Sequence, residues 1–421
     1  MTTGLILAGI IVVLILLRQN IILTLAVAVA FIHAYMAKSR PEFLIQDIWF
    51  TVDREVLLSI PMFIVAGMVM ARGSIAARLT RIMAALTPNI PGGLGIATVL
   101  SLAGFSAISG SSVVTMMAIG SIMYPALLKA GYSKKFSLGL LCSGGTLGII
   151  IPPSILMIVY GIMTEVSITD LFLAGWGPGL LLTSGLCLYS YIVNRNMATK
   201  AIDMAELATA LREGTAALLM PVILLGGIYS GYFTVTESAA LAVAYALLIE
   251  FFIHRELKAK DFGNILLETI KLLGSLLPLV AIAGSLNTIL DYAGVPAALV
   301  NFMQGYVVDK WSMLLVVNVL LLLAGALMDE VSAIVVLAPL LHPLGMAYGF
   351  DPIHFGIITI VNLQIGYVAP PVAINLIVAM VVFKEQFGFI CRSVIPFIGI
   401  MLAALLVTAV FPQLSLMFLG K

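Results

Sequence analysis

The sequence has very little charge. Only 10% of its 421 residues are Asp, Glu, Lys or Arg, whereas soluble domains carry about a quarter. Because 62% of the residues are hydrophobic, the chain cannot cover a water-soluble surface, which excludes a soluble enzyme or binding domain. The formal net charge of +1 offers no basic surface for nucleic acid. We therefore expect an all-α polytopic membrane protein with no nucleic-acid partner.

Cysteines and catalytic motifs are also scarce. Cys142, Cys187 and Cys391 sit in apolar stretches and are spaced for neither disulfides nor a metal site, so we interpret them as packing residues. No Gly-x-Ser-x-Gly elbow and no His-Glu-x-x-His motif occurs, and the adjacent acids Asp329 and Glu330 would point in different directions on a helix. An intramembrane enzyme, such as a protease, is therefore the disfavoured alternative, and we predict no catalytic residue.

The chain contains an internal repeat. Residues 104–157 align without a gap on residues 322–375, at a constant offset of 218. Most of the coinciding residues are Gly or Pro, which set the shape of the backbone. The matching positions are Val113 with Val331, Pro125 with Pro343, Gly131 with Gly349, Gly148 with Gly366, and Pro152-Pro153 with Pro370-Pro371. In a membrane protein, paired interruptions in two halves indicate the binding site of a secondary transporter.

Apolar runs between polar breaks predict about ten transmembrane crossings. They lie at residues 4–17, 21–37, 55–71, 135–164, 171–194, 215–231, 235–253, 271–290, 353–382 and 392–418. The run at 4–17 has no preceding basic region, so we interpret it as the first helix rather than a signal peptide. Residues 93–128 and 311–347 each hold two short apolar arms around a polar tip, which predicts two re-entrant helical hairpins. The charged stretches 73–90, 198–213 and 255–268 predict surface or interfacial helices.

The distribution of Lys and Arg predicts the topology. Most of them fall on the cytoplasmic side when both termini are placed in the periplasm. The two repeats are then inverted, which is the geometry of alternating access. The expected organisation is residues 1–54, N-terminal scaffold helices; 55–195, first inverted repeat with hairpin 93–128 and broken helix 135–164; 196–270, scaffold and interfacial helices; and 271–421, second inverted repeat with hairpin 311–347 and broken helix 353–382.

A Pro-Pro pair interrupts one helix in each half. Because proline has no N–H, each pair leaves two carbonyl oxygens without a helical partner, those of Gly148 and Ile149 in the first half and of Gly366 and Tyr367 in the second. Unwound carbonyls that line a cavity commonly bind Na⁺. The alternative is a kink whose oxygens are satisfied by neighbouring helices and water. Since both breaks face a polar hairpin tip, we favour two cation sites.

The hairpin tips carry the second group of candidates. Ionisable residues within a membrane are functional candidates by default, and helix N-termini favour an anionic group. The predicted substrate-binding residues at the tips are Ser111, Ser112, Asp329 and Glu330. Serines that bond back to their own helix, and an acidic pair that caps the second arm, are the alternatives. Asn362, Gln364 and Asn375 flank the second break and could equally be substrate donors or interhelical hydrogen bonders.

Four ordered motifs resemble one transporter family. They are Gly110-Ser111-Ser112, the run from Gly144 to Ser154, the run Gly175-Trp176-Gly177-Pro178-Gly179, and the run from Pro370 to Leu376. Together they resemble the large membrane subunit (M subunit) of tripartite ATP-independent periplasmic (TRAP) transporters, of the ion transporter superfamily, over essentially the whole chain. The resemblance implies an elevator-type, Na⁺-driven importer of small organic anions in the bacterial inner membrane, with separate scaffold and transport domains. It also implies two partners, a small four-helix membrane subunit and a periplasmic substrate-binding protein.

The resemblance also implies ligands for Na⁺, largely backbone oxygens. The first site would use Ser106, Ser109, Gly148, Ile151 and Pro153, and the second Gly325, Gly366, Ala369 and Val372. Relatives often have Thr where this chain has Ala369, so a side-chain ligand would be lost there. Cytoplasmic Lys and Arg are expected to contact lipid headgroups.

The substrate is less well indicated than the family. Related systems carry C4-dicarboxylates, sialic acids and other carboxylates. Asp329 and Glu330 argue against a bare dicarboxylate, and sialic acid suits the Ser and Asn residues better. A stand-alone Na⁺/divalent-anion symporter that needs no binding protein is the alternative.

Overall fold

The protein is built from helices. The computed structural model describes residues 6, 9–10, 13–14, 17, 19–36 and 41–420, and over these residues every regular element is a helix. Nine helical segments of this part are long and apolar enough to cross a membrane, or up to ten if a bent pair counts as one span. This confirms the all-α polytopic class. The crossing predicted at 4–17 falls mostly outside the described residues.

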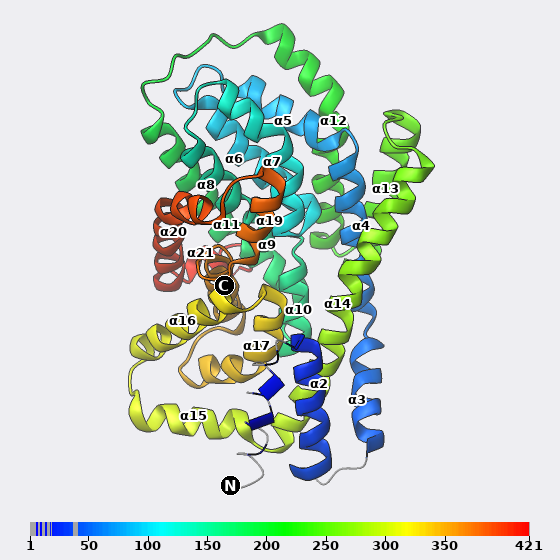
Figure 1. Cartoon of the computed structure of the whole chain (residues 1–421), viewed down its shortest axis with the longest axis vertical. Coiled ribbons are helices and arrows are strands. Elements are labelled where there is room, and N and C mark those ends of the chain that lie inside the picture. The colour runs from blue at the N-terminus through cyan, green and yellow to red at the C-terminus, as the bar shows by residue number, and fades with distance from the viewer. Residues whose placement is uncertain are drawn as a thin grey trace.

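One group of helices, here called the long-helix group, lies mostly on the right-hand side of the molecule in Figure 1. In this group α14 packs against α2, α3 and α4, α13 packs against α4, and α12 packs against α5. The bounds are α2 Ile21–Phe31, continued by the π-helical turn η1 Ile32–Met36; α3 Pro41–Val52; η2 Glu55–Leu58 with α4 Ser59–Arg72; α5 Ile75–Leu86; α12 Met204–Tyr229; α13 Val235–Leu247 with η3 Leu248–Ile253; and α14 Ala259–Tyr292.

The remaining helices contain the two hairpins and the two broken helices. The first half has α6 Gly93–Ser109, α7 Ser112–Lys129, α8 Lys134–Gly145, α9 Leu147–Ile150, α10 Ile155–Thr164 and α11 Ile168–Val193. The second has α15 Val295–Tyr306, α16 Lys310–Leu327, α17 Glu330–Ala347, α18 Pro352–Gly366, α19 Ile374–Phe383, α20 Phe387–Val410 and α21 Gln413–Leu416. The helix-turn-helix hairpins α6–α7 and α16–α17 match the ranges 93–128 and 311–347 closely.

Both predicted helix breaks are present. The first span bends by 42° between Lys134–Ile150 and Ile155–Thr164. In the second half, α18 ends at Gly366 and α19 begins at Ile374. Each gap holds its Pro-Pro pair, and both Pro-Pro peptide bonds are cis. The breaks therefore lie where the missing proline N–H groups predict them.

The structure differs from the sequence-based expectations in the connecting regions. The stretches 198–213 and 255–268 do not form separate helices, because their helical residues are the first turns of the continuous helices α12 and α14. No Pro and no second helix cap separates these charged turns from the apolar turns that follow, so the helix continues. Helices α3 and α15 were not anticipated. Helix α15 starts after Gly294, which has a φ of 65°, with a proline in its first turn.

A buried carboxylate fixes one corner of the long-helix group. Glu250 of η3 is fully buried and its Oε1 accepts the backbone N–H groups of Ser74 and Ile75, each at 2.9 Å. These N–H groups belong to the start of α5 and have no partner within the helix. Glu237, at the start of α13, forms a capping box with Thr234. Side-chain caps thus position α5 and α13.

Candidate functional site

The first hairpin tip packs directly on the first helix break. Gly110, between α6 and α7, has a φ of 60°, and its carbonyl oxygen accepts the N–H of Ile155 at 3.2 Å. A Cβ added to Gly110 would lie 2.8 Å from the Pro153 carbonyl oxygen. A Cβ on Gly148 would lie 2.7 Å from the carbonyl group of Ser111. Glycine is therefore required at both positions for the tip and the break to meet.

The second tip meets the second break in a similar way. The N–H of Val372 donates to the carbonyl oxygen of Ala326 at 3.2 Å. A Cβ on Gly366 would lie 2.7 Å from Cα of Gly325, so two glycine backbones are in contact. Gly366 is the repeat equivalent of Gly148. The tip-to-break contact is thus a shared feature of both halves.

The five residues proposed for the first Na⁺ site come together here. Ser106 Oγ is buried without a hydrogen-bond partner, and Ser109 Oγ lies 2.6 Å from the hydroxyl of Thr115. Among the described residues, no hydrogen-bond donor reaches the Gly148 carbonyl oxygen, whereas the Ile149 oxygen accepts the hydroxyl of Ser154 at 2.5 Å. Ile151 and Pro153 line the same break. Uncharged oxygens without donors fit an alkali cation.

The residues proposed for the second Na⁺ site fit a cation less well. Gly325, Gly366 and Val372 are together, but the Gly366 oxygen already accepts the N–H of Ala369 at 3.0 Å. One lone pair of that oxygen remains for a ligand. Ala369 contributes no side-chain oxygen. A second site would consequently depend on carbonyl groups alone.

A cavity of about 240 Å³ lies between the two hairpin tips. The first tip and α10, the second tip, and the helices α2, α4 and α14 all contribute to its lining. The lining residues are Asn20, Ile21, Ile22, Ile64, Gly110, Ser111, Val114, Ile155, Leu156, Leu272, Ser275, Leu276, Leu279, Asp329, Glu330, Val331 and Ser332. Helices from both repeats thus enclose one small, mostly apolar space with a few polar groups, as small-molecule sites do.

Three of the predicted substrate residues line this cavity: Ser111, Asp329 and Glu330. Asp329 acts as the N-cap of α17, since its Oδ2 accepts the N–H of Ser332 at 2.9 Å and its Oδ1 accepts the Ser332 hydroxyl. Glu330 Oε2 is buried and has no hydrogen-bond partner. The capping alternative therefore applies to Asp329, while Glu330 remains available to a ligand.

The other predicted substrate residues lie elsewhere. Asn362 donates to Asn318 of α16, and Asn375 donates to the carbonyl oxygen of Cys142 at 3.0 Å. Gln364 donates to Thr146. None of these three, nor Ser112, is among the cavity-lining residues, and all four are fully buried. Their amide N–H groups make interhelical hydrogen bonds, which was the alternative interpretation for the Asn and Gln residues.

Two polar lining residues outside the hairpin tips were missed in the sequence. Asn20 precedes α2 and accepts the N–H of Ile22, and Ser275 lies on α14 with its hydroxyl bonded to the Leu272 carbonyl oxygen. Ser275 is a lone polar residue in an apolar run, which is a weak signal. Neither residue lies in the repeat that identified the tips, so only packing of α2 and α14 against the tips places them here.

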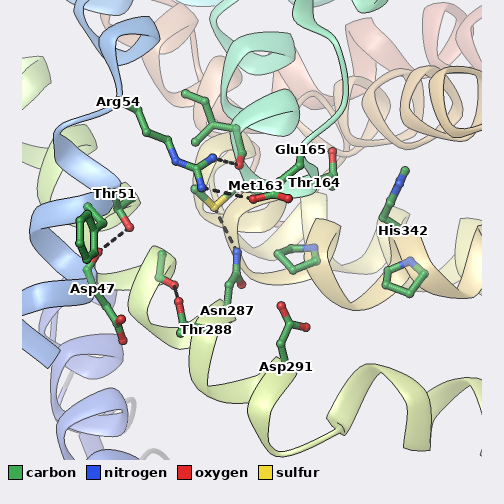
Figure 2. A pocket seen from close by; sticks show the side chains of 15 residues that line it. Asp47, Thr51, Arg54, Met163, Thr164, Glu165, Asn287, Thr288, Asp291 and His342 are labelled. Carbon is green, nitrogen blue, oxygen red and sulfur yellow. Dashed lines mark hydrogen bonds and ion pairs between the residues drawn. The ribbon is translucent and has the colours of Figure 1, made fainter. Parts of the chain in front are cut away.

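A larger cavity of about 450 Å³ lies farther along α10, α14 and α17 (Figure 2). Arg54, just after α3, donates to the Ile162 carbonyl oxygen at 2.8 Å and to Glu165 Oε1 at 3.4 Å. On the other side, Asn287 of α14 contacts the Met163 sulfur at 3.4 Å. This cavity lies between α3 and α14 on one side and the end of α10 and α17 on the other, and these polar contacts cross it.

Acidic side chains line this second cavity from more than one element. Asp291, on the wall formed by α14, lies across the cavity from Glu165 (Figure 2). The ion pair between Arg54 and Glu165 is solvent-exposed, since their side chains are 45% and 81% exposed.

Comparison with known proteins gives consistent matches over most of the chain. Residues 8–414 match the family model described as "Tripartite ATP-independent periplasmic transporter, DctM component". The C4-dicarboxylate TRAP transporter large permease protein DctM of Pseudomonas aeruginosa is 40% identical over 87% of this chain and 86% of that protein. The isethionate TRAP transporter permease protein DctMQ of Oleidesulfovibrio alaskensis is 39% identical over 91% of this chain, which spans only 61% of that relative's length. The ectoine TRAP transporter large permease protein TeaC of Halomonas elongata is 34% identical over 94% of this chain and 93% of that protein.

The fold also has a solved counterpart. The crystal structure of the Alcanivorax borkumensis YdaH transporter superposes with a TM-score of 0.64 over 88% of this chain and 87% of that chain. Its sequence identity of 16% supports the similarity of fold alone.

Proposed function

Because the chain belongs to the DctM component family of tripartite ATP-independent periplasmic transporters, as a large permease of this type, we propose that it imports small organic anions by Na⁺-coupled secondary active transport. The proposed substrates are carboxylates, the class that includes sialic acid and the C4-dicarboxylates. A periplasmic substrate-binding protein delivers the substrate, and a small four-helix membrane subunit completes the assembly in the bacterial inner membrane. The Lys and Arg distribution supports both termini in the periplasm.

One observation supports this proposal above the others. The tips of two hairpins, one from each repeat, contact the two broken helices and together enclose the 240 Å³ cavity. Discontinuous helices at a repeat interface are the usual site of substrate and coupling ion in secondary transporters. The arrangement brings the proposed ion ligands and the proposed substrate ligands onto the same moving elements.

The first break is the stronger candidate for Na⁺. The proposed ligands are the carbonyl oxygens of Gly148, Ile151 and Pro153 and the hydroxyls of Ser106 and Ser109, and of these the Ser106 hydroxyl is buried without a hydrogen-bond partner. The ion would hold the tip and the break together in the shape that encloses the cavity. Occupation by Na⁺ and closure of the substrate site are thereby coupled.

The cavity around Arg54 supports an elevator movement. It lies between the proposed scaffold helices α3 and α14 and the transport elements α10 and α17, and its contacts are long or exposed. Exposed ion pairs contribute only about 0–1 kcal/mol, so the contacts across this cavity offer little resistance to sliding. We propose that hairpins and broken helices move together past these scaffold helices.

The deciding experiment is uptake into proteoliposomes. The chain is reconstituted with its small-subunit partner, and labelled sialic acid, succinate and ectoine are offered with or without an inward Na⁺ gradient and with or without the cognate binding protein. Uptake that requires both Na⁺ and the binding protein supports the proposal. Na⁺-driven uptake without the binding protein would instead support a stand-alone symporter, and uptake indifferent to Na⁺ would refute the coupling.

A further inference from the structure

We propose that the cavity between the hairpin tips selects a compact zwitterion, a solute with one carboxylate and one positively charged N–H group, and that Glu330 recognises the cationic group. This inference rests on the proposed transport function and specifies its substrate class. It follows from an asymmetry between the two tips.

The first tip offers an anion-binding end. Helix α7 is 18 residues long, and its N-cap residue Ser111 makes no side-chain capping hydrogen bond. The first N–H groups of an α-helix have no partner within the helix, and its N-terminus carries a partial positive charge of about half a unit. Gly110, Ser111 and Val114 form this wall of the cavity. A substrate carboxylate placed here would meet free N–H donors.

The second tip offers the opposite chemistry. The N-terminus of α17 is already capped by Asp329, which accepts both the N–H and the hydroxyl of Ser332. Glu330 follows it, and its Oε2 is buried without a hydrogen-bond donor. A buried carboxylate oxygen is costly unless a donor reaches it. A bound ammonium or amidinium N–H group would supply that donor.

The lining of the cavity contains no balancing cation. None of the described residues that line it is Lys, Arg or His. Asp329 and Glu330 both line it. The second carboxylate of a dicarboxylate would therefore face two acidic side chains at close range in a site of low dielectric, where like charges repel strongly. A zwitterion instead offers its carboxylate to the first tip and its cationic group to Glu330.

The size of the cavity restricts the solute further. Its volume of about 240 Å³ is below the range of roughly 300–1,000 Å³ that is common for drug-sized ligands. Apart from the polar residues of the two tips, the lining is mainly aliphatic, from Ile64, Ile155, Leu276 and Leu279. The cavity thus favours a small solute with an apolar middle.

The test measures binding to the permease itself. The full chain with its small-subunit partner, in lipid nanodiscs with saturating Na⁺, is titrated calorimetrically with ectoine, a cyclic amidinium carboxylate, and with succinate, a dicarboxylate of similar size. We expect ectoine to bind at least tenfold more tightly than succinate. The variant Glu330→Gln should weaken ectoine binding at least tenfold and improve succinate binding. Glu330→Asp, which keeps the charge, should retain the preference for ectoine.

A matched control removes the same charge elsewhere. Glu256 is exposed and lies outside the cavity, so Glu256→Gln should change neither affinity. The proposal is overturned if succinate binds the unmodified permease as tightly as ectoine, if neither compound binds, or if Glu330→Gln leaves their ratio unchanged. The comparison of ectoine with succinate on the unmodified permease does not depend on whether any variant folds.

Failure of this inference is separable from failure of the transport proposal. Succinate uptake that depends on Na⁺ and on the binding protein would uphold the proposed function while rejecting a zwitterion. Loss of Na⁺ dependence would reject the proposed function whatever the permease binds.

Discussion

Gln364 donates a hydrogen bond from its Nε2 to the hydroxyl of Thr146 at 2.9 Å, and the two residues are separated by 218 positions. This separation equals the offset of the internal repeat, so equivalent residues of the two halves touch. The two broken helices therefore meet at their corresponding points, in the centre of the hairpin-containing part. Both side chains are fully buried, and Gln364 Oε1 has no partner.

Replacing Gln364 should reduce the stability of this central contact. The variant Gln364→Ala removes the buried hydrogen bond and leaves an empty space, so we expect a loss of about 1–3 kcal/mol. Thermal unfolding of the reconstituted protein measures it. The exposed Gln413→Ala is the control and should change little. An unaltered midpoint for Gln364→Ala would show that the contact contributes nothing to stability.

Adding a methyl group at the second break should separate it from its hairpin. In Gly366→Ala the new Cβ would fall 2.7 Å from Cα of Gly325, where backbone meets backbone. We expect the Na⁺ concentration that gives half-maximal stabilisation to be at least tenfold higher for this variant. A Na⁺ titration followed by thermal unfolding measures it. Gly388→Ala provides the comparison, because no atom lies within 4 Å of its added Cβ. Equal Na⁺ responses in the two variants would argue against an ion site at this break.

Linking the two sides of the Arg54 cavity should stop transport. Asn287 and Met163 are in contact across it, so Asn287→Cys with Met163→Cys can be joined by a short bifunctional thiol reagent in a background without the native cysteines. Uptake should be abolished by the reagent in the double variant and preserved in each single variant. Transport that continues after complete cross-linking would contradict the elevator movement.

Stability should depend on pH through Glu385. Its carboxylate accepts hydrogen bonds from Lys134 Nζ at 3.0 Å and from the Tyr124 hydroxyl at 2.9 Å, and these bonds lower the pKa of Glu385 below its usual value. A lowered pKa in the folded state contributes stability above the ordinary carboxyl pKa, and this contribution is lost as the pH falls through the folded-state pKa.

The variant Lys134→Ala isolates this contribution. It should be less stable than the parent at pH 7, and the difference should shrink on acidification below about pH 4. Lys135→Ala, an exposed neighbour, should show no such trend. Chemical unfolding at several pH values measures the difference, and a gap that stays constant with pH would exclude Glu385 as its source.

The hairpins and breaks were predictable from the sequence because their causes are local. Proline at positions 152–153 and 370–371 removes specific backbone donors, and polar tips between short apolar arms end the helices there. The observed arms, Gly93–Ser109 with Ser112–Lys129 and Lys310–Leu327 with Glu330–Ala347, follow those ranges. Helices α3 and α15 lacked such signals and were missed.

The direction of individual polar side chains was not predictable in the same way. Asn362, Gln364 and Asn375 flank the second break, yet their amide groups bond to α16, Thr146 and Cys142 instead of facing the cavity. Asp329 and Glu330 are neighbours, yet one caps a helix and the other has an unpartnered oxygen at the cavity.

The sequence by itself determined the membrane class, the repeat, and the positions of the hairpins and helix breaks. These depend on hydropathy and on backbone hydrogen bonding within a few residues, which each segment carries independently. Only the tertiary structure decided that both tips enclose one cavity, that Asn20 and Ser275 join it, and that Glu330 faces it without a partner. The reason is physical: these relations depend on how helices far apart in the chain pack, and no local pattern specifies that packing.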